Sequence, residues 1–400
     1  MTNVHSKALD QSIQVERIIG HIKGLSPGPT LIFTGGIHGN EPSGVFALKK
    51  VVQDIQNQGI KIKGNFYAIS GNLWALERGV RFHKEDLNRV WTKSRIMELN
   101  GQYKKEEHED IHQQKEILAE INSILTKESG PFYFFDLHTT SSATLPFLTV
   151  NDSMQNRKFT MQYPLPIILG IEEYLDGPLL SYINELGYVA FGFEAGQHDT
   201  MASIENNVAF IYLSMLFCGA VCQEQIEFHK CYEILAKTTG DIRKIYEIYF
   251  RYLIKPDEDF KMRPGFFNFQ RIRANQEIAD SGNKVIRAKQ DGRIFMPLYQ
   301  AQGVDGFFAI RKVLPFFLVL SGFMRRIRID RLFVLLPGVN WYAKDRKTLV
   351  VNRKIAIFFA KQFFHLMGYR SKTLDKNRYI MKNREDSARN EEYENEIWYR

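Results

Sequence analysis

The first 240 residues of the chain alternate between short apolar runs and longer segments with apolar residues at helical spacing. Four apolar runs have the length and composition of buried strands, and they lie at residues 30–34, 65–70, 132–137 and 188–194. Four segments predict helices, at residues 41–55, 105–127, 178–186 and 202–221. Because strands separated by helices are typical of an α/β domain with a mostly parallel sheet, we predict that architecture for residues 1–250.

The hydrophobic pattern changes near residue 250. Short β-prone runs follow, separated by Gly265, Gly282, Gly292, Gly303 and Gly306. We therefore predict a small all-β domain over residues 251–310. Residues 311–370 are aromatic and basic and form a predicted extension. Residues 371–400 are charged and poor in apolar residues, so we expect a mobile tail.

Composition limits the classes of protein that fit this pattern. The chain has 400 residues, of which 44% are hydrophobic and 24% charged, as in globular proteins with a substantial core. Its three cysteines are too few for a disulfide framework. The first residues contain no apolar segment typical of a secretory signal, and no run of about 18 apolar residues predicts a spanning helix. We expect a cytoplasmic protein.

The positive charge is concentrated in one segment. The net charge is +8, but residues 311–370 contain 13 Lys and Arg against 2 Asp and Glu. The remainder of the chain is therefore close to neutral, which argues against a nucleic-acid-binding protein. The basic segment itself is compatible with an anionic membrane surface, with a protein partner, or with a solvated basic face.

Two predicted strand ends bear groups that can bind a metal ion. His38 follows the first strand and Glu41 opens the next helix, while Asp136 and His138 end a later strand. Ligands gather outside the carboxyl ends of strands in an open α/β sheet. Two histidines and one carboxylate with an open fourth position are typical of catalytic zinc. Asp136 can orient a ligand histidine.

Other polar groups fit the same chemistry. Glu194 ends another apolar strand and could accept a proton from water. Arg81, Asn88 and Arg89 lie in a polar stretch, and arginine binds carboxylates or polarises carbonyl groups. Each motif taken alone is equally compatible with a structural role, as a loop histidine, a strand-end carboxylate or a solvated charged loop.

Taken together, four motifs resemble the succinylglutamate desuccinylase/aspartoacylase family, which has a zinc carboxypeptidase-like fold. They are GGIHGNEPSG at 35–44, DLNR at 86–89, DLHTTSS at 136–142 and FEAGQH at 193–198, in the family's order. The resemblance covers roughly residues 15–310. It implies a three-layer α/β/α domain with a mixed, mostly parallel sheet, followed by a small β-rich domain like a barrel-sandwich hybrid that narrows access to the zinc.

The resemblance also implies roles for individual residues. His38, Glu41 and His138 match the family's ligands for one Zn²⁺, and Glu194 matches its general base. Arg81 matches the arginine that polarises the scissile carbonyl.

Asn88 and Arg89 match the pair that binds the substrate carboxylate. The implied activity is zinc-dependent hydrolysis of the amide of a small N-acyl amino acid by an activated water.

The sequence departs from aspartoacylase at two places in the substrate pocket. The stretch Gly306-Phe307-Phe308 lacks the family's pocket tyrosine, and residues 181–185 lack the arginine that binds a second substrate carboxylate. These departures argue against N-acetylaspartate as substrate. Two alternatives remain open: a carboxypeptidase-like hydrolase of peptides, and a zinc-retaining binding protein that acts through residues 311–370.

Overall fold

The computed structural model describes residues 1–101, 107–300, 302–342, 348–352, 355, 367–375 and 377–400. The first two residues of the predicted helix at 105–127 therefore lie outside the described residues, as do parts of the predicted basic extension. Within the described residues, every helix and strand predicted before residue 240 is present, with ends shifted by a few residues.

The first half of the chain supplies one end of a large sheet, after an amino-terminal hairpin. The hairpin consists of β1 (Thr2–Ser6) and β2 (Gln11–Val15). The sheet strands from this half are β3 (Ile18–Lys23), β4 (Ser26–Gly35), β5 (Lys63–Ser70), β6 (Phe132–Thr140), β7 (Phe147–Val150), β8 (Ile167–Leu169) and β9 (Val189–Gln197). Strands β5, β4, β6 and β9 are parallel neighbours, so their carboxyl ends share one edge.

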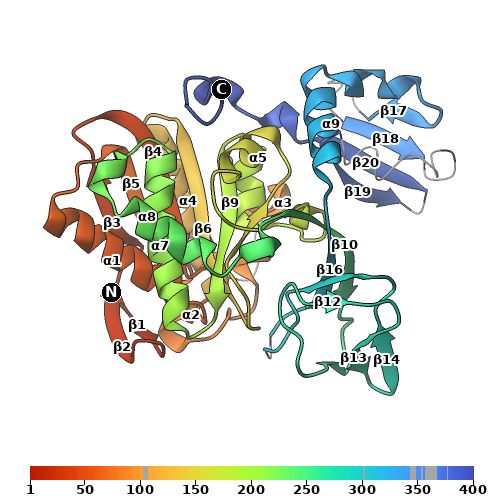
Figure 1. The fold of residues 1–400 in the computed structure, drawn as a ribbon, viewed down its shortest axis with the longest axis horizontal. Helices are drawn as coiled ribbons and strands as arrows, with labels where there is room; N and C mark the ends of the chain where they lie inside the picture. The colour runs from red at the N-terminus through yellow and green to blue at the C-terminus, as the bar shows by residue number, and fades with distance from the viewer. Residues whose placement is uncertain (102–106, 301, 343–347, 353–354, 356–366, 376) are drawn as a thin grey trace.

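Helices cover both faces of this part of the sheet (Figure 1). One face packs against α1 (Ser43–Gln58), α5 (Met154–Thr160), α7 (Met201–Phe217) and α8 (Phe228–Ala236). The other packs against α4 (Glu109–Lys127) and α6 (Leu179–Glu185). The connection between β5 and α4 contains α2 (Leu73–Arg78) and α3 (Lys93–Leu99).

The two-sided cover explains the continuous apolar runs in the sequence. In β4, Leu31 and Phe33 belong to the core on the α1 side, whereas Ile32 belongs to the core on the α4 side. Successive side chains of a strand point to opposite faces, so both sets must be apolar. The predicted three-layer α/β/α architecture with a mixed sheet is confirmed.

The predicted β-rich domain is present, and it continues the main sheet. Its strands are β10 (Ile245–Leu253), β11 (Phe260–Met262), β12 (Arg271–Ile272), β13 (Glu277–Ser281), β14 (Lys284–Arg287), β15 (Gly292–Phe295) and β16 (Asp305–Lys312). Because β10 pairs with β8, the main sheet has eleven strands in the order β12-β15-β16-β10-β8-β7-β9-β6-β4-β5-β3. Strands β11, β13 and β14 form a separate sheet.

A third unit follows β16, and in Figure 1 it lies above the β-rich domain, beside the part of the main domain that contains α5. It contains α9 (Pro315–Arg326), the 3₁₀ helix η5 (Ile329–Leu335), and a sheet of β17 (Val339–Trp341), β18 (Thr348–Asn352), β20 (Arg378–Asn383) and β19 (Tyr369–Asp375). The boundary expected at residue 370 is wrong, since β19 crosses it.

The expected mobile tail is a second correction, because the last residues pack against the main domain. Tyr393 is fully buried. Its hydroxyl donates to the carbonyl of Phe132 at 2.6 Å and accepts from the amide of Val189 at 3.0 Å. Trp398 Nε1 donates to the hydroxyl of Tyr133 at 3.0 Å. Two large aromatic rings can anchor a segment that is otherwise charged.

Candidate active site

The candidate site lies at the shared carboxyl edge of β4, β6 and β9. His38 follows β4, Glu41 precedes α1, His138 lies in β6 and Glu194 lies in β9. The register pairs His138 with Glu194 across neighbouring parallel strands. Gly39 brings the His38 loop against α2 so closely that a Cβ there would collide with the backbone of Ala75. The loop that positions His38 therefore requires glycine.

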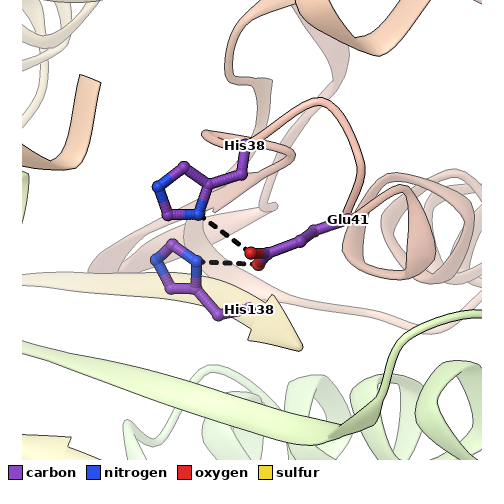
Figure 2. A group of neighbouring side chains, drawn as sticks. All are labelled: His38, Glu41 and His138. Carbon is purple, nitrogen blue, oxygen red and sulfur yellow. Dashed lines mark hydrogen bonds and ion pairs between the residues drawn. The ribbon is translucent and has the colours of Figure 1, made fainter. Parts of the chain in front are cut away.

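His38, Glu41 and His138 form a buried cluster (Figure 2). Nδ1 of His38 lies 2.9 Å from Oε1 of Glu41, and Nδ1 of His138 lies 3.1 Å from Oε2 of Glu41. One ligand atom from each of the three residues lies within 4.8 Å of the other two. Two imidazole nitrogens and a carboxylate at this spacing are a donor set that suits zinc.

The outer nitrogen of each imidazole also contacts a carboxylate. Nε2 of His38 donates to Oδ1 of Asp86 at 2.9 Å, and Nε2 of His138 donates to Oδ2 of Asp136 at 2.7 Å. A neutral imidazole has only one N–H, so it cannot donate to carboxylates on both sides. Each Nδ1 contact therefore needs a second proton or a cation, and the site fits a metal ion on the Glu41 side.

Charge supports the same conclusion. Glu41, Asp86, Asp136 and Glu194 bring four carboxylates to the site, against the guanidinium groups of Arg81 and Arg89. Burial alone would lower the pKa of His138, but Asp136 and Glu41 raise it well above its usual value. A cation bound beside Glu41 would neutralise part of this excess negative charge.

Arg81 bridges two of these carboxylates. Its Nη1 donates to Oε1 of Glu41 at 3.3 Å and its Nη2 donates to Oδ2 of Asp86 at 3.1 Å. Nε of Arg81 is buried without a hydrogen-bond partner among the described residues. The guanidinium is thus held beside the cluster with a donor unused.

Asn88 and Arg89 lie in the short 3₁₀ helix η1 (Leu87–Arg89). Oδ1 of Asn88 accepts from the amide of Leu179 at 3.2 Å, and Nη2 of Arg89 lies 3.5 Å from Oδ2 of Asp305 in the β-rich domain. Both residues line the same cavity as the His–Glu–His cluster. They are therefore held between the amino-terminal domain and the β-rich domain.

Glu194 is an unusual buried carboxylate. Its side chain lines the cavity, and within the described part of the chain its Oε2 has no hydrogen-bond partner. Burial raises the pKa of Glu194 to about 8, and the nearby Glu41 carboxylate adds to this effect. A carboxylate with such a pKa can take up and release a proton near neutral pH.

The cavity has a volume of about 430 Å³. Its lining includes all seven site residues expected from the sequence: His38, Glu41, Arg81, Asn88, Arg89, His138 and Glu194. The cavity also has apolar lining residues, among them Ile171, Leu175, Pro178, Leu180 and Phe308, which we call the apolar wall. Phe308 comes from β16, so the β-rich domain contributes directly to the cavity, in the position expected for it.

Two residues of the site were missed by sequence reasoning. Asp86 belongs to the DLNR motif but received no role, although it holds His38. His198 lines the cavity, and its Nδ1 lies 2.7 Å from the hydroxyl of Thr139. The sequence contains a signal for Asp86, because a metal-ligating histidine usually needs a carboxylate at its second nitrogen.

The family model of the succinylglutamate desuccinylase/aspartoacylase catalytic domain matches residues 27–207. Among curated proteins, the succinylglutamate desuccinylase of Pseudoalteromonas atlantica is 31% identical over 143 residues, which are 34% of this chain and 40% of that protein. The chain thus matches less than half the length of the curated relatives.

Solved structures share the fold over a longer region. A succinylglutamate desuccinylase/aspartoacylase from Rhodobacter sphaeroides has a TM-score of 0.54 at 14% identity, covering 74% of this chain and 88% of that one. The succinylglutamate desuccinylase of Vibrio cholerae has a TM-score of 0.53 at 16% identity, covering 72% and 82%. The expected fold is confirmed. Residues 27–207 are similar to the catalytic domain of the succinylglutamate desuccinylase/aspartoacylase family, as the sequence motifs indicate.

Proposed function

We propose that the protein is a zinc-dependent hydrolase that cleaves the amide of a small N-acyl amino acid. The observation that carries this proposal is the position of Glu194. Its unpartnered carboxylate oxygen is buried in a cavity beside two histidines and a carboxylate that suit a metal ion. A buried carboxylate without a partner is costly to a fold, so its retention beside a metal-type cluster supports a chemical role.

The proposed metal ligands are Nδ1 of His38, Nδ1 of His138 and the carboxylate of Glu41. Zinc held there would supply Lewis acidity, which lowers the pKa of water and polarises a carbonyl group. Asp86 and Asp136 hold the two imidazoles by their outer nitrogens, which leaves both Nδ1 atoms facing Glu41. The protein's part is to keep this donor set in one orientation.

Glu194 acts as the proton carrier of the reaction. Its carboxylate takes a proton from the attacking water as the oxygen of that water bonds to the amide carbon. The same proton then passes to the amide nitrogen, the carbon–nitrogen bond breaks, and a carboxylic acid and a free amine leave. Nε of Arg81 is the available donor for the negative charge that develops on the carbonyl oxygen.

Arg89 and Asn88 bind the carboxylate of the amino acid. Arg89 presents a guanidinium to the cavity, and Asn88 is held beside it by the amide of Leu179. A guanidinium can pair with a carboxylate through two parallel hydrogen bonds. This pairing favours a substrate with a free carboxylate close to the scissile bond.

The test is a screen of N-acyl amino acids for amine release, combined with metal analysis of the purified protein. We expect about one zinc per chain, and we expect Glu194→Gln to lower kcat by roughly 10²- to 10⁴-fold while zinc content stays unchanged. The matched control is Glu205→Gln, an exposed residue on nearby α7. Full hydrolysis by the Glu194→Gln protein would refute the proposed role.

A further inference from the structure

Helix α9 exposes apolar side chains and buries polar ones, the reverse of the usual arrangement in a globular protein. Phe316, Val319 and Phe323 recur at helical spacing on one face and are 68%, 72% and 60% exposed. Ile327, directly after the helix, continues this face and is also exposed. A helix of a globular protein normally buries its apolar face, whereas the described residues leave this one largely uncovered.

Polar side chains fix this orientation from the opposite face of α9. Ser321 and Arg325 are both buried. Nη2 of Arg325 donates to Oδ2 of Asp152 at 2.8 Å, and Nη1 of Arg157 donates to the hydroxyl of Ser321 at 3.2 Å. Rotating the helix to bury its phenylalanines would break these buried ionic contacts, which is strongly unfavourable. The outward apolar face is therefore built into the fold.

The neighbouring 3₁₀ helix adds to the exposed apolar surface. η5 contacts α9, and it buries Phe333 in the core of the third unit. Leu332, Leu335 and Leu336, by contrast, are exposed. Figure 1 shows α9 at the edge of the third unit, beside its four-stranded sheet. We call the exposed apolar side chains of this region the α9–η5 face; they are Phe316, Val319, Phe323, Ile327, Leu332, Leu335 and Leu336.

Positive charge accompanies the α9–η5 face. Lys312 precedes α9, Arg326 is its last residue, and Arg331 lies in η5. All three side chains are exposed. None of these three side chains forms an ion pair with another described residue. Because these three exposed cations lie beside the apolar side chains, two copies of this surface would repel each other. The charge favours an anionic partner over a second copy.

We propose that the α9–η5 face docks onto the surface of a lipid bilayer that contains anionic lipids. Exposed Phe, Val, Ile and Leu side chains would enter the boundary between headgroups and acyl chains, and the three unpaired cations would contact the headgroups. Within the described residues, no helix is long and apolar enough to cross a bilayer. None of the described residues that line the catalytic cavity belongs to the α9–η5 face.

Vesicle sedimentation of the full chain tests this proposal. We expect binding to vesicles of phosphatidylcholine mixed with phosphatidylserine, weaker binding to phosphatidylcholine alone, and loss of binding as salt is raised. Phe316→Ser combined with Phe323→Ser should lower the partition coefficient by roughly tenfold or more, because each substitution removes a large apolar side chain. Lys312→Gln combined with Arg331→Gln should weaken binding to the mixed vesicles and leave binding to phosphatidylcholine vesicles unchanged.

The controls are Leu25→Ser and Lys61→Gln, which alter exposed side chains of the amino-terminal domain. Both should bind vesicles as the unchanged protein does, and all variants should keep its melting temperature. Failure of the unchanged protein to bind the mixed vesicles would overturn the proposal. The proposal would also be overturned if the unchanged protein were a dimer that does not bind vesicles and the phenylalanine substitutions made it a monomer. That result would assign the face to a second copy of the chain.

Discussion

At the scale of single residues, the candidate ligands depend on two carboxylates that are not ligands. Asp86 and Asp136 each accept a hydrogen bond from the outer nitrogen of one histidine. These contacts determine which ring nitrogen carries hydrogen, and therefore which one faces Glu41. The orientation of the candidate ligand histidines thus depends on one residue that caps a 3₁₀ helix and on one residue of a strand.

We predict that Asp136→Asn lowers zinc affinity by about 10- to 100-fold, with Asp86→Asn acting similarly on His38. The amide is nearly isosteric but neutral, so it loses the charge that makes the imidazole a better ligand. Competition with a chromophoric chelator measures the affinity. Asp199→Asn serves as the control, because the ion-pair partner of Asp199 among the described residues is the exposed Lys7, at 3.3 Å. Unchanged affinity in both aspartate variants would contradict the proposed orienting role.

At the scale of elements, the substrate cavity lies between a loop and a strand from different domains. The loop from Ile171 to Leu180 and strand β16, with Phe308, form the apolar wall. Among the described residues that line the cavity, the guanidinium groups are those of Arg81 and Arg89. Arg81 already contacts Glu41 and Asp86. Arg89 lies 3.5 Å from one carboxylate, that of Asp305, and its Nε has no hydrogen-bond partner among the described residues. We therefore expect Arg89, rather than Arg81, to pair with a substrate carboxylate.

This arrangement predicts a preference for apolar amino acids. We expect kcat/KM for N-acetylleucine to exceed that for N-acetylaspartate by about tenfold or more, because the second carboxylate of the latter would be buried without a partner. Parallel assays of the two substrates at the same zinc content measure the ratio. Equal or reversed ratios would show that the apolar wall does not contact the side chain of the substrate.

At the scale of the whole molecule, a buried ionic cluster joins the third unit to the main domain. Asp152 lies between β7 and α5, and it contacts Arg157 of α5 and Arg325 of α9. Burial alone would raise the pKa of Asp152, but Arg157 and Arg325 lower it below its usual range. Nη1 of Arg325 also donates to Glu385 at 3.0 Å. The cluster therefore connects three distant parts of the sequence.

The low pKa of Asp152 predicts a loss of stability in acid. The unfolded protein takes up a proton on this residue below about pH 4, whereas the folded protein does so only at lower pH. The stabilisation is thus present at neutral pH and is lost progressively as pH falls below about 4. We expect Asp152→Asn to cost about 3–5 kcal/mol at neutral pH, with the difference narrowing in acid.

Urea unfolding at neutral pH and at about pH 3 measures this difference. Glu227→Gln is the matched control, because Glu227 and Lys230 form an exposed pair at 2.6 Å. It should cost no more than about 1 kcal/mol at either pH. A constant difference between the Asp152→Asn protein and the unchanged protein across this range would contradict the ionic explanation.

The carboxyl-terminal segment makes a second connection across the molecule. Tyr393 lies against β6 and β9, the two strands that contain His138 and Glu194. We predict that Tyr393→Ala lowers the free energy of unfolding by about 3–5 kcal/mol, because a large buried ring is removed. Tyr393→Phe should cost about 1–3 kcal/mol, since the amide of Val189 loses its acceptor.

Thermal and urea unfolding of the two variants provide the measurement. Ile397→Ala, at a side chain that is 93% exposed in the same segment, is the control and should change little. If Tyr393→Ala were as stable as the unchanged protein, the last residues would not be part of the folded core.

Local sequence determined the architecture of the amino-terminal half and the composition of its site. Apolar runs and helical spacing act over a few neighbouring residues, so the strands and helices before residue 240 were predictable. The metal-type cluster and Glu194 were predictable as well, because His38, His138 and Glu194 each lie at a strand end, and parallel strands end at one edge. Arg81, Asn88 and Arg89 were reached as a polar stretch and through the family resemblance.

Only the tertiary structure decided which distant groups share an environment. It showed that Asp86 holds His38, that one carboxylate oxygen of Glu194 is buried without a partner, and that Tyr393 is buried against the sheet. It also showed that α9 buries Arg325 and exposes its phenylalanines, the reverse of what hydrophobic patterning indicates. The physical reason is that burial and charge compensation depend on contacts between residues far apart in the chain, which no local pattern of side chains encodes.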